Sequence, residues 1–361
     1  MKKAIIVGEK GHIETLEELK LLLATLNIET VAPFIINTKT ISRSTFLTSG
    51  KLEELKGIAP LLSADVVAFD FSLSYTQIAN LKKSIPAMIL DRPRIILEIF
   101  SKRALTREGK IQVELAYLKL RLPELVNPRA KLDQQMGFIG GKGPGEKKLE
   151  LNRRALGIRI QSLKKKLRTI EKNRIQKRDR RMKSDQFIVS LVGYTNAGKS
   201  TLFNQLTKQT MPTDDLLFHT LEPKISKGFL SSGIHPVLFA DTVGFIRNLP
   251  HELIESFKST LEEISLSDLL LIVLDSHDPA VITQYGVIQD TLHDIKADHL
   301  PYVVAYNKSD LQNPELDKPE ILSALGDGIW ISAKTGEGLD NLRSCILSQL
   351  FHHFSDQEVR E

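Results

Sequence analysis

A glycine-rich segment in the second half of the chain constrains its fold more than any other feature. Residues 193–200 read GYTNAGKS and fit the pattern G-x-x-x-x-G-K-[ST], which cradles phosphate groups between a strand and a helix. The apolar run 187–192 precedes this loop, and the helical stretch 201–206 follows it. The context predicts an α/β domain in which backbone N–H groups and a helix N-terminus bind a nucleotide. We expect Lys199 to reach the β- and γ-phosphates and the Ser200 hydroxyl to bind Mg²⁺.

Two later segments indicate which base the nucleotide carries. Asn307-Lys308-Ser309-Asp310 follows the apolar run 302–306, and Ser332-Ala333-Lys334 follows another short apolar run. A carboxylate placed like Asp310 accepts hydrogen bonds from guanine N1–H and the exocyclic amine, whereas adenine offers no matching donor pair. N-K-x-D alone is a common surface turn, but after a phosphate loop it predicts GTP rather than ATP. The expected nucleotide contacts are Gly193, Tyr194, Thr195, Asn196, Ala197, Gly198, Lys199, Ser200, Thr201, Asp241, Gly244, Asn307, Lys308, Asp310, Ser332, Ala333 and Lys334.

The segment Asp241-Thr242-Val243-Gly244 is the candidate sensor of the γ-phosphate. It follows the apolar run 237–240, so it is expected to lie at the end of a strand. Asp241 would hold Mg²⁺ through water, and the Gly244 N–H would contact the γ-phosphate. The expected metal ligands, with Mg²⁺ as the cofactor, are Ser200, Thr220 and Asp241.

A switch threonine and the attacking water are harder to assign. Thr220 is the candidate that closes on Mg²⁺, with Thr210 and Thr213 as competitors. Phe245 stands where many GTPases have a glutamine that orients the attacking water, and phenylalanine cannot do this. We therefore expect slow intrinsic hydrolysis, with the water positioned by another residue or by a partner, and we assign no catalytic residue. The expected switch residues are Phe218, Thr220 and Phe245.

Length and composition predict a cytoplasmic protein of more than one domain. The chain has 361 residues, of which 42% are hydrophobic and 26% charged, as in ordinary globular proteins. Its one cysteine, Cys345, permits no internal disulfide, and no apolar run approaches the ~18 residues of a membrane span. We expect a monomer without a membrane span, and leave a peripheral membrane fraction open.

The first 96 residues predict a small parallel α/β domain. Short apolar runs at residues 3–8, 31–36, 65–70 and 87–91 alternate with leucines spaced by three or four residues. This alternation is typical of parallel sheets covered by helices. The segment contains no phosphate loop or catalytic cluster, so we interpret it as a docking or scaffold domain.

Residues 97–184 combine a heptad pattern with a high positive charge. Leu149, Leu156, Leu163 and Ile170 repeat every seven residues, which predicts an antiparallel helical hairpin with the stretch around residues 111–122. Residues 142–183 contain 17 Lys and Arg and 4 Asp and Glu, a net charge of +13; since the whole chain carries +5, the remainder carries −8. A charge concentrated in this way favours binding to nucleic acid through phosphates and shape, without DNA sequence specificity.

A glycine-rich loop lies between the two predicted helices. Residues 137–145 contain five glycines, and read alone they are a flexible connector. At the tip of a basic arm they favour a phosphate contact, because glycine permits close backbone approach and the flanking cations release counterions. The expected RNA contacts are Gly140, Gly141, Lys142, Gly143, Gly145, Lys147, Lys148, Arg153 and Arg154.

Several motifs together resemble the HflX-type GTPases over about residues 45–350. They are Asp91-Arg92-Pro93, residues 100–104 and 108–116, Gly143-Pro144-Gly145-Glu146 leading to Arg153-Arg154, Asp241 to Arg247, and residues 249–251 and 259–263. The resemblance implies a ribosome-associated GTPase that binds the 50S subunit, directs the glycine-rich loop towards the peptidyl transferase region and splits or rescues stalled ribosomes under stress. It implies an N-terminal α/β domain (1–96), a helical arm (97–184), a C-terminal P-loop G domain (185–351) and a tail (352–361).

The chain departs from the family pattern after Thr220. Residues 221–226 read LEPKIS, where the family usually has Asp-Pro and then a Thr-Thr-Arg run, so details of this switch stay open. Two alternatives to ribosome splitting also remain. One is a GTP-gated RNA-binding factor in ribosome assembly, and the other is a regulator whose arm binds a protein helix.

Overall fold

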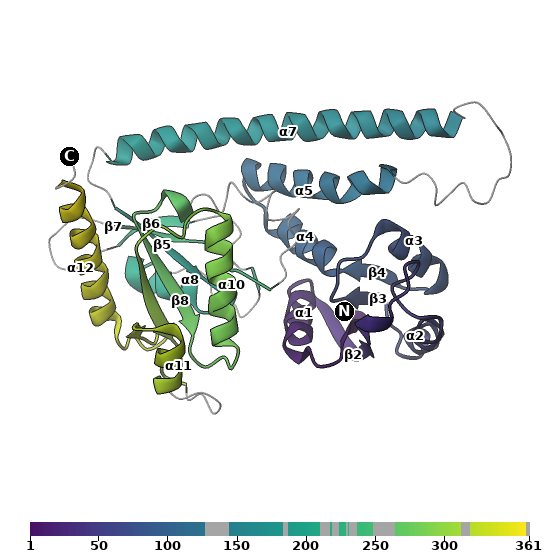
Figure 1. Cartoon of the computed structure of the whole chain (residues 1–361), viewed down its shortest axis with the longest axis horizontal. Helices are drawn as coiled ribbons and strands as arrows, with labels where there is room; N and C mark the ends of the chain where they lie inside the picture. The colour runs from purple at the N-terminus through teal and green to yellow at the C-terminus, as the bar shows by residue number, and fades with distance from the viewer. Residues whose placement is uncertain are drawn as a thin grey trace. The chain divides into compact units, whose positions relative to one another are not determined.

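The described residues of the computed structural model form two compact units, each built around one sheet (Figure 1). The first unit contains the N-terminal sheet and the helical middle region up to residue 169, and the second contains the C-terminal sheet. The predicted fold class, with an N-terminal α/β part, a helical middle region and a C-terminal P-loop domain, is confirmed; the boundaries at residues 96, 184 and 351 stay predictions. The structure describes residues 1–126, 144–182, 187–209, 217–218, 224–228, 230, 237–247, 264–311 and 318–358.

The N-terminal sheet has four parallel strands in the order β2-β1-β3-β4. Its strands and helices alternate along the chain as predicted, and the strands read as apolar runs because helices cover both faces. The elements are β1 (Lys2–Glu9), α1 (Ile13–Thr25), β2 (Ile28–Ile36), α2 (Ser49–Leu61), β3 (Val66–Phe69), α3 (Tyr75–Ser84), β4 (Met88–Asp91) and α4 (Arg92–Arg103).

The motif Asp91-Arg92-Pro93 organises the end of β4 and the start of α4. Asp91 caps the helix by accepting a hydrogen bond from the Arg94 N–H at 3.2 Å, and Pro93 occupies the first turn, where its missing N–H costs nothing. Arg92 is only 2% exposed, and its guanidinium binds Asp70 and Glu18 at 2.5 Å each. Burial alone lowers the pKa of Arg92, but the two carboxylates outweigh it and the pKa is raised.

The helical middle region pairs α5 (Arg107–Val126) with α7 (Pro144–Met182), and the two helices run antiparallel (Figure 1). Arg159 on α7 binds Glu114 on α5 through two bonds, Nε–Oε1 at 2.6 Å and Nη2–Oε2 at 2.9 Å. Leu115 and Leu163 are buried in this region, whereas Arg153 is exposed. The predicted heptad therefore forms a short apolar contact, and most charged side chains on the exposed face of α7 are basic.

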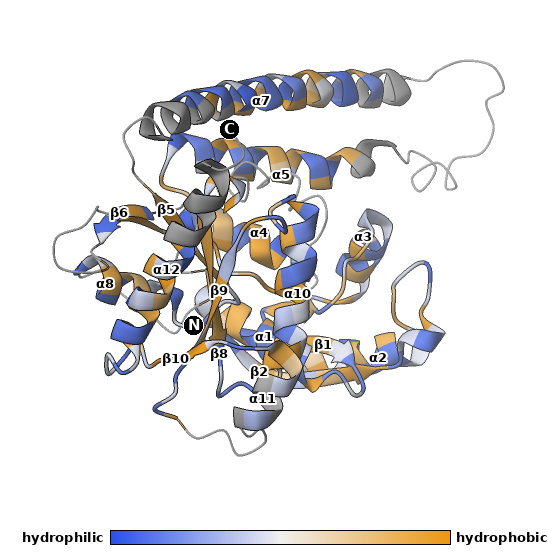
Figure 2. Cartoon of the chain, turned by 60° about the vertical axis from the view of Figure 1, so that its left-hand side comes forward, coloured by the Kyte–Doolittle hydropathy of each residue, from blue (hydrophilic) through white to orange (hydrophobic). Residues whose placement is uncertain are grey.

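The C-terminal sheet has six strands in the order β10-β9-β8-β5-β7-β6, and only β6 is antiparallel to its neighbour. One face packs against α8 and α12, and the other against α10. Figure 2 shows β8 and β9 as hydrophobic strands inside the unit. The elements are β5 (Ile188–Gly193), α8 (Lys199–Thr207), β6 (Lys224–Gly228), β7 (Val237–Asp241), β8 (Leu269–Asp275), α10 (Val281–Asp294), β9 (Tyr302–Asn307), α11 (Lys318–Leu325), β10 (Ile329–Trp330) and α12 (Leu339–Glu358).

This strand order places the predicted motifs at one edge of the sheet. β5 lies between β7 and β8 and is parallel to both, and β9 is parallel to β8. Parallel strands end at the same edge, so the segments after β5, β7 and β9 meet there.

Among the described helices, none is both long and apolar enough to cross a membrane.

Candidate nucleotide-binding site

The glycine-rich loop connects the end of β5 to the start of α8. A Cβ atom at Gly193 would lie 2.3 Å from the carbonyl oxygen of Val273 on the neighbouring strand. Gly198 has a φ of +88°, and a Cβ there would lie 2.2 Å from the side-chain nitrogen of Asn307. Both positions require glycine, because the loop backbone passes closer to its neighbours than a side chain allows. The loop ends at the N-terminus of α8, whose free N–H groups are suited to an anion.

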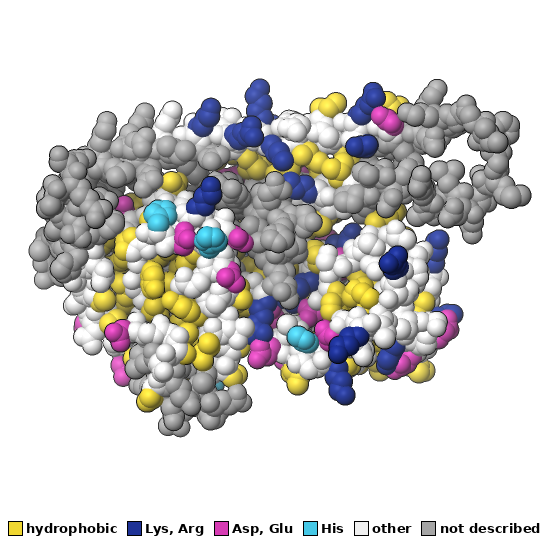
Figure 3. Space-filling view, in the orientation of Figure 1, with side chains coloured by type: hydrophobic (Ala, Val, Ile, Leu, Met, Phe, Trp, Pro, Cys, Tyr) yellow, Lys and Arg dark blue, Asp and Glu magenta, His cyan; other side chains and the backbone are white. Residues whose placement is uncertain are grey.

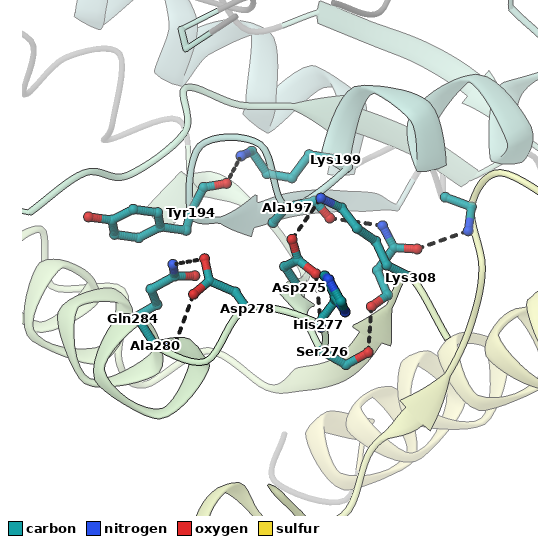
Figure 4. A network of polar contacts seen from close by, with 12 residues as sticks. Tyr194, Ala197, Lys199, Asp275, Ser276, His277, Asp278, Ala280, Gln284 and Lys308 are labelled. Carbon is teal, nitrogen blue, oxygen red and sulfur yellow. Dashed lines mark hydrogen bonds and ion pairs between the residues drawn. The ribbon is translucent and has the colours of Figure 1, made fainter. Parts of the chain in front are cut away.

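Lys199 is held inside this loop. Its side chain is buried, and Nζ donates hydrogen bonds to the carbonyl oxygens of Tyr194 at 2.7 Å and Gly193 at 3.1 Å (Figure 4). Burial lowers the pKa of Lys199 to about 8, and the nearby carboxylate of Asp241 acts in the opposite direction. The ammonium group is thus fixed beside the helix N-terminus, where an incoming phosphate can compete for it.

Ser200 and Asp241 place two side-chain oxygens close together next to the loop. The Ser200 hydroxyl donates to Asp241 Oδ2 at 2.8 Å, and Asp241 is fully buried at the end of β7. Thr242 donates to the carbonyl oxygen of Leu191, which fixes the backbone just after the carboxylate. One carboxylate and one hydroxyl fit Mg²⁺, which binds few protein ligands and completes its shell with water and phosphate oxygens. Accordingly, the described residues contain no cluster of three or more His, Cys, Asp or Glu suited to a metal.

Asn307 joins the glycine-rich loop to the second predicted base-recognition segment. Its side-chain Nδ2 donates to the carbonyl oxygen of Ala197 at 2.8 Å, and its Oδ1 accepts from the Ala333 N–H at 2.9 Å. Its own carbonyl oxygen accepts from the N–H and the hydroxyl of Ser276. One amide side chain therefore sets the spacing between the phosphate side and the base side of the site.

Lys308 and Asp310 belong to the same predicted segment as Asn307. Lys308 adopts a φ of +66° and its Nζ binds Asp275 Oδ2 at 2.6 Å (Figure 4). Asp310 is exposed, and a hydrogen bond from the Ser332 side chain lowers the pKa of Asp310, which keeps it ionised as an acceptor. Ser332 and Ala333 are buried, so the peptide groups of this turn are held in place.

Phe245 does not face the site. Its side chain is 4% exposed and packs in the apolar cluster between the sheet and α10. Its backbone pairs with the glycine-rich loop: Phe245 N–H donates to Gly193 O at 3.0 Å, and Thr195 N–H donates to Phe245 O at 2.8 Å. A Cβ at Gly244 would lie 2.7 Å from Thr195 Cγ2, so only glycine permits this approach. The side chain that replaces the usual glutamine is therefore part of the core.

Sequence reasoning missed Asp275 and Ser276 as members of this site. Asp275 is opposite Asn307 in the pairing of β8 with β9. Polar residues that end two neighbouring apolar strands were a signal that could have found Asp275, since both strand ends lie at the ligand edge of the sheet. Ser276 gave no such signal, because its role is to bind the backbone of Asn307.

The remaining predicted residues are only partly described. Thr220 and its competitors Thr210 and Thr213 lie outside the described residues, whereas Phe218 is buried with a φ of +56°. Of the expected RNA contacts, Gly140, Gly141, Lys142 and Gly143 lie outside the described residues. The backbones of Gly145, Lys147 and Lys148 belong to α7, but the surroundings of these three residues are not described. Arg153 and Arg154 are exposed on α7, and Arg154 binds Glu150 at 3.2 Å.

Comparison with known proteins places the chain in a family. Three family models match it in sequence order: a GTP-binding GTPase N-terminal region at residues 13–101, a GTP-binding GTPase middle region at 103–181, and a 50S ribosome-binding GTPase at 188–308. The chain resembles the solved structure of the SsGBP and GDP complex, with 26% identity, a TM-score of 0.55, and coverage of 98% of this chain and 99% of that one. A GTP-binding protein from Sulfolobus solfataricus in complex with GDP, 24% identical with a TM-score of 0.53, shares the fold over 98% of this chain and 99% of that one.

Two curated relatives cover nearly the whole chain. The GTPase HflX of Caldanaerobacter subterraneus is 45% identical over 347 residues, which is 96% of this chain and 79% of that protein. The GTPase HflX of Escherichia coli K12 is 37% identical over 359 residues, 99% of this chain and 84% of that protein. With the glycine-rich loop, the Ser200–Asp241 hydrogen bond and the two Asn307 side-chain hydrogen bonds all formed, this similarity shows that the chain belongs to the HflX family of GTPases.

Proposed function

We propose that the edge of the C-terminal sheet at residues 193–201, 241–244, 307–310 and 332–334 is where this GTPase binds and hydrolyses GTP. The observation that carries the proposal is the Asn307 side chain, bonded on one side to Ala197 and on the other to Ala333. A nucleotide must be held at both ends, and this residue fixes the distance between the two ends. The ionised Asp310 supplies the acceptor for the guanine donors.

The residues of the chain have separate roles in this proposal. Lys199 would leave the loop carbonyls for the β- and γ-phosphates, while the N–H groups at the start of α8 bind phosphate oxygens. Ser200 would hold Mg²⁺ directly, Asp241 through water, and Gly244 would donate its N–H to the γ-phosphate. Mg²⁺, when bound, would neutralise charge on the phosphates. Because Phe245 is buried, water must be positioned by another group, and we propose that a partner supplies or orders it.

We propose that this partner is the 50S ribosomal subunit, bound in part through ribosomal RNA. The third matching family model is described as a 50S ribosome-binding GTPase. The outer face of α7 carries a series of cations that could bind phosphates, and Figure 3 shows Lys and Arg along this helix. The described, exposed cations on α7 are Arg153, Arg154, Arg159, Lys165, Lys166, Arg168 and Lys172. Such a series would make binding fall steeply with salt.

The biological role we propose is the splitting or rescue of stalled ribosomes under stress, by a monomeric cytoplasmic protein. GTP would order the switches and favour the docked state, and hydrolysis would release it. The alternative is a GTP-gated assembly factor that binds ribosomal RNA without splitting. Neither role is favoured by the geometry of the nucleotide site itself, because both need the same switch.

GTP turnover tests the partner. We expect slow turnover by the protein alone and a large stimulation by 50S subunits that an equal mass of free ribosomal RNA does not reproduce. The double variant Lys165→Glu/Arg168→Glu should lose this stimulation at moderate salt, whereas Lys296→Glu, an exposed lysine of the second unit, should retain it. Absence of any stimulation would contradict the ribosomal partner while leaving GTP binding intact. A separate measurement distinguishes the two roles: loss of the 70S peak in a sedimentation profile, when the protein and GTP are added to ribosomes, would favour splitting over assembly.

A further inference from the structure

We infer that Tyr194 is a positioning residue that holds residues 241–247 against the glycine-rich loop and thereby sets the preference for GTP over GDP. The inference rests on the proposed nucleotide site, within which Gly244 contacts the γ-phosphate. Tyr194 itself contacts no reacting atom in this account. It acts through the backbone of the segment that carries Gly244.

Besides the Ser200–Asp241 bond, three hydrogen bonds among the described residues join this segment to the loop, and we call these three the switch bridge. Phe245 N–H donates to Gly193 O at 3.0 Å, and Thr195 N–H donates to Phe245 O at 2.8 Å. The third bond involves a side chain: Arg247 N–H donates to the Tyr194 hydroxyl oxygen at 2.5 Å. The two backbone bonds hold Phe245, and the Tyr194 hydroxyl also holds Arg247, two residues further along the chain.

The position of the Tyr194 hydroxyl is fixed by packing. Its side chain is 6% exposed and lies in the same apolar cluster as Phe245, with Val192 and Ile272 of the adjoining strands. An aromatic ring in a packed core has little rotamer freedom, and a buried tyrosine hydroxyl normally finds a hydrogen-bond partner. The hydroxyl is therefore a rigid acceptor, and the Arg247 backbone is placed relative to the sheet rather than to solvent.

Gly244 lies between two fixed points. On one side Thr242 donates to the carbonyl oxygen of Leu191 at 2.6 Å, and on the other side the switch bridge holds Phe245. A Cβ atom at Gly244 would lie 2.7 Å from Thr195 Cγ2 and 3.0 Å from Lys199 Nζ. The Gly244 backbone thus lies too close to Thr195 and Lys199 for a side chain at this position.

This arrangement affects GTP and GDP differently. In the proposed site the Gly244 N–H contacts the γ-phosphate, which GDP lacks, whereas the loop, Lys199 and the base segments contact both nucleotides. Ordering the donor before the ligand arrives removes an entropy cost from GTP binding and from the hydrolysis step. Loosening the switch bridge should therefore weaken GTP and leave GDP nearly unchanged.

The test is Tyr194→Phe, which keeps the ring in the core and removes the hydroxyl that accepts from the Arg247 N–H. The matched control is Tyr306→Phe in the same apolar cluster, whose hydroxyl donates to Gly326 O at 2.7 Å. Both variants lose one hydrogen bond to backbone from a buried tyrosine, so their losses of stability should be similar. The measurements are the Kd of a fluorescent GDP, the Kd of a non-hydrolysable GTP analogue, and single-turnover hydrolysis without a partner.

We expect Tyr194→Phe to raise the Kd of the GTP analogue about fivefold, the effect of one net hydrogen bond, and to slow single turnover by a similar factor. Its Kd for GDP should stay within about twofold of wild type, and Tyr306→Phe should leave the ratio of the two Kd values unchanged. Equal weakening of both nucleotides, or no change in either, would overturn the inference. Wild-type protein that bound neither nucleotide would overturn the proposed site instead, and this inference with it.

Discussion

The side chain of Asn307 donates a hydrogen bond to the carbonyl oxygen of Ala197, 2.8 Å away across 110 positions of sequence. The same side chain accepts from the Ala333 N–H at 2.9 Å. Asn307 is the last residue of β9, and its side chain therefore connects the turn after β5 with the turn after β10. A residue of the N-K-x-D pattern, which sequence reasoning assigns to the base, thus also determines the shape of the phosphate loop.

Asn307→Ala should weaken GTP and GDP alike. It leaves the buried Ala333 N–H and the Ala197 carbonyl without their partner, at about 1–3 kcal/mol for each group, so we expect affinity to fall by roughly 30-fold or more. Equilibrium binding of fluorescent GDP and of a GTP analogue measures the change. Asn152→Ala, the same truncation at an exposed position on α7, should leave both affinities unchanged. A loss confined to GTP would contradict the bridging role.

Asp310→Asn should change the base that the protein prefers. The carboxylate accepts from the guanine amine, whereas an amide can donate to the oxygen that xanthine carries at the same position. We expect GTP affinity to drop by about 100-fold or more and XTP to become the better ligand. Competition between the two nucleotides for the fluorescent ligand measures the ratio. Retained GTP preference in this variant would show that guanine is not read by Asp310.

Lys199 predicts a pH dependence of stability in the nucleotide-free protein. Its pKa in the folded chain is about 8, against 10.5 for an ordinary lysine. Below pH 8 the lysine is charged in both the folded and the unfolded protein, so the free-energy cost of burying the charge lowers stability in full. Between pH 8 and 10.5 the folded protein loses the proton first, so this lysine makes stability rise with pH, by up to about 3 kcal/mol. Urea unfolding from pH 7 to 10 measures the slope.

The control for this slope is Lys199→Met, which removes the titrating group and keeps an unbranched buried side chain. Its unfolding free energy at pH 7 should exceed that of wild type, and the difference should shrink as pH rises towards 10. The same variant should fail to bind GTP. Parallel stability curves for the two proteins would show that the buried ammonium is not the cause.

Arg92→Met should destabilise the N-terminal unit. It removes the cation between Asp70 and Glu18 and leaves two buried carboxylates facing each other, which costs about 3–5 kcal/mol. Thermal or urea unfolding of the full chain measures the loss, and Arg43→Met at an exposed site should have almost no effect. GDP affinity should be unchanged in the folded protein, since Arg92 lies outside the proposed nucleotide site. Wild-type stability in Arg92→Met would contradict a structural role for this cluster.

Local sequence alone was sufficient for the apolar parallel strands and for the glycine-rich turn, but not for the antiparallel strand β6. The glycines of residues 193–198 predicted a loop that no other residue could form, and the structure shows why at Gly193 and Gly198. The apolar runs predicted the parallel strands, because a strand covered on both faces must be apolar throughout. The heptad of Leu156 and Leu163 predicted the helix pair. Each of these depends on neighbours within a few positions.

Tertiary structure decided which distant groups meet. The pairing of Arg92 with Glu18, of Arg159 with Glu114, and of Asn307 with Ala197 follows from strand order and helix packing, which residue spacing does not contain. The same holds for Phe245: its identity excluded a glutamine's role, but only the packed core showed its ring turned away from the site and its backbone bonded to the loop. Hydrogen bonds and burial are properties of positions in space, so the sequence could name candidate nucleotide-binding residues but could not show which of them contact one another.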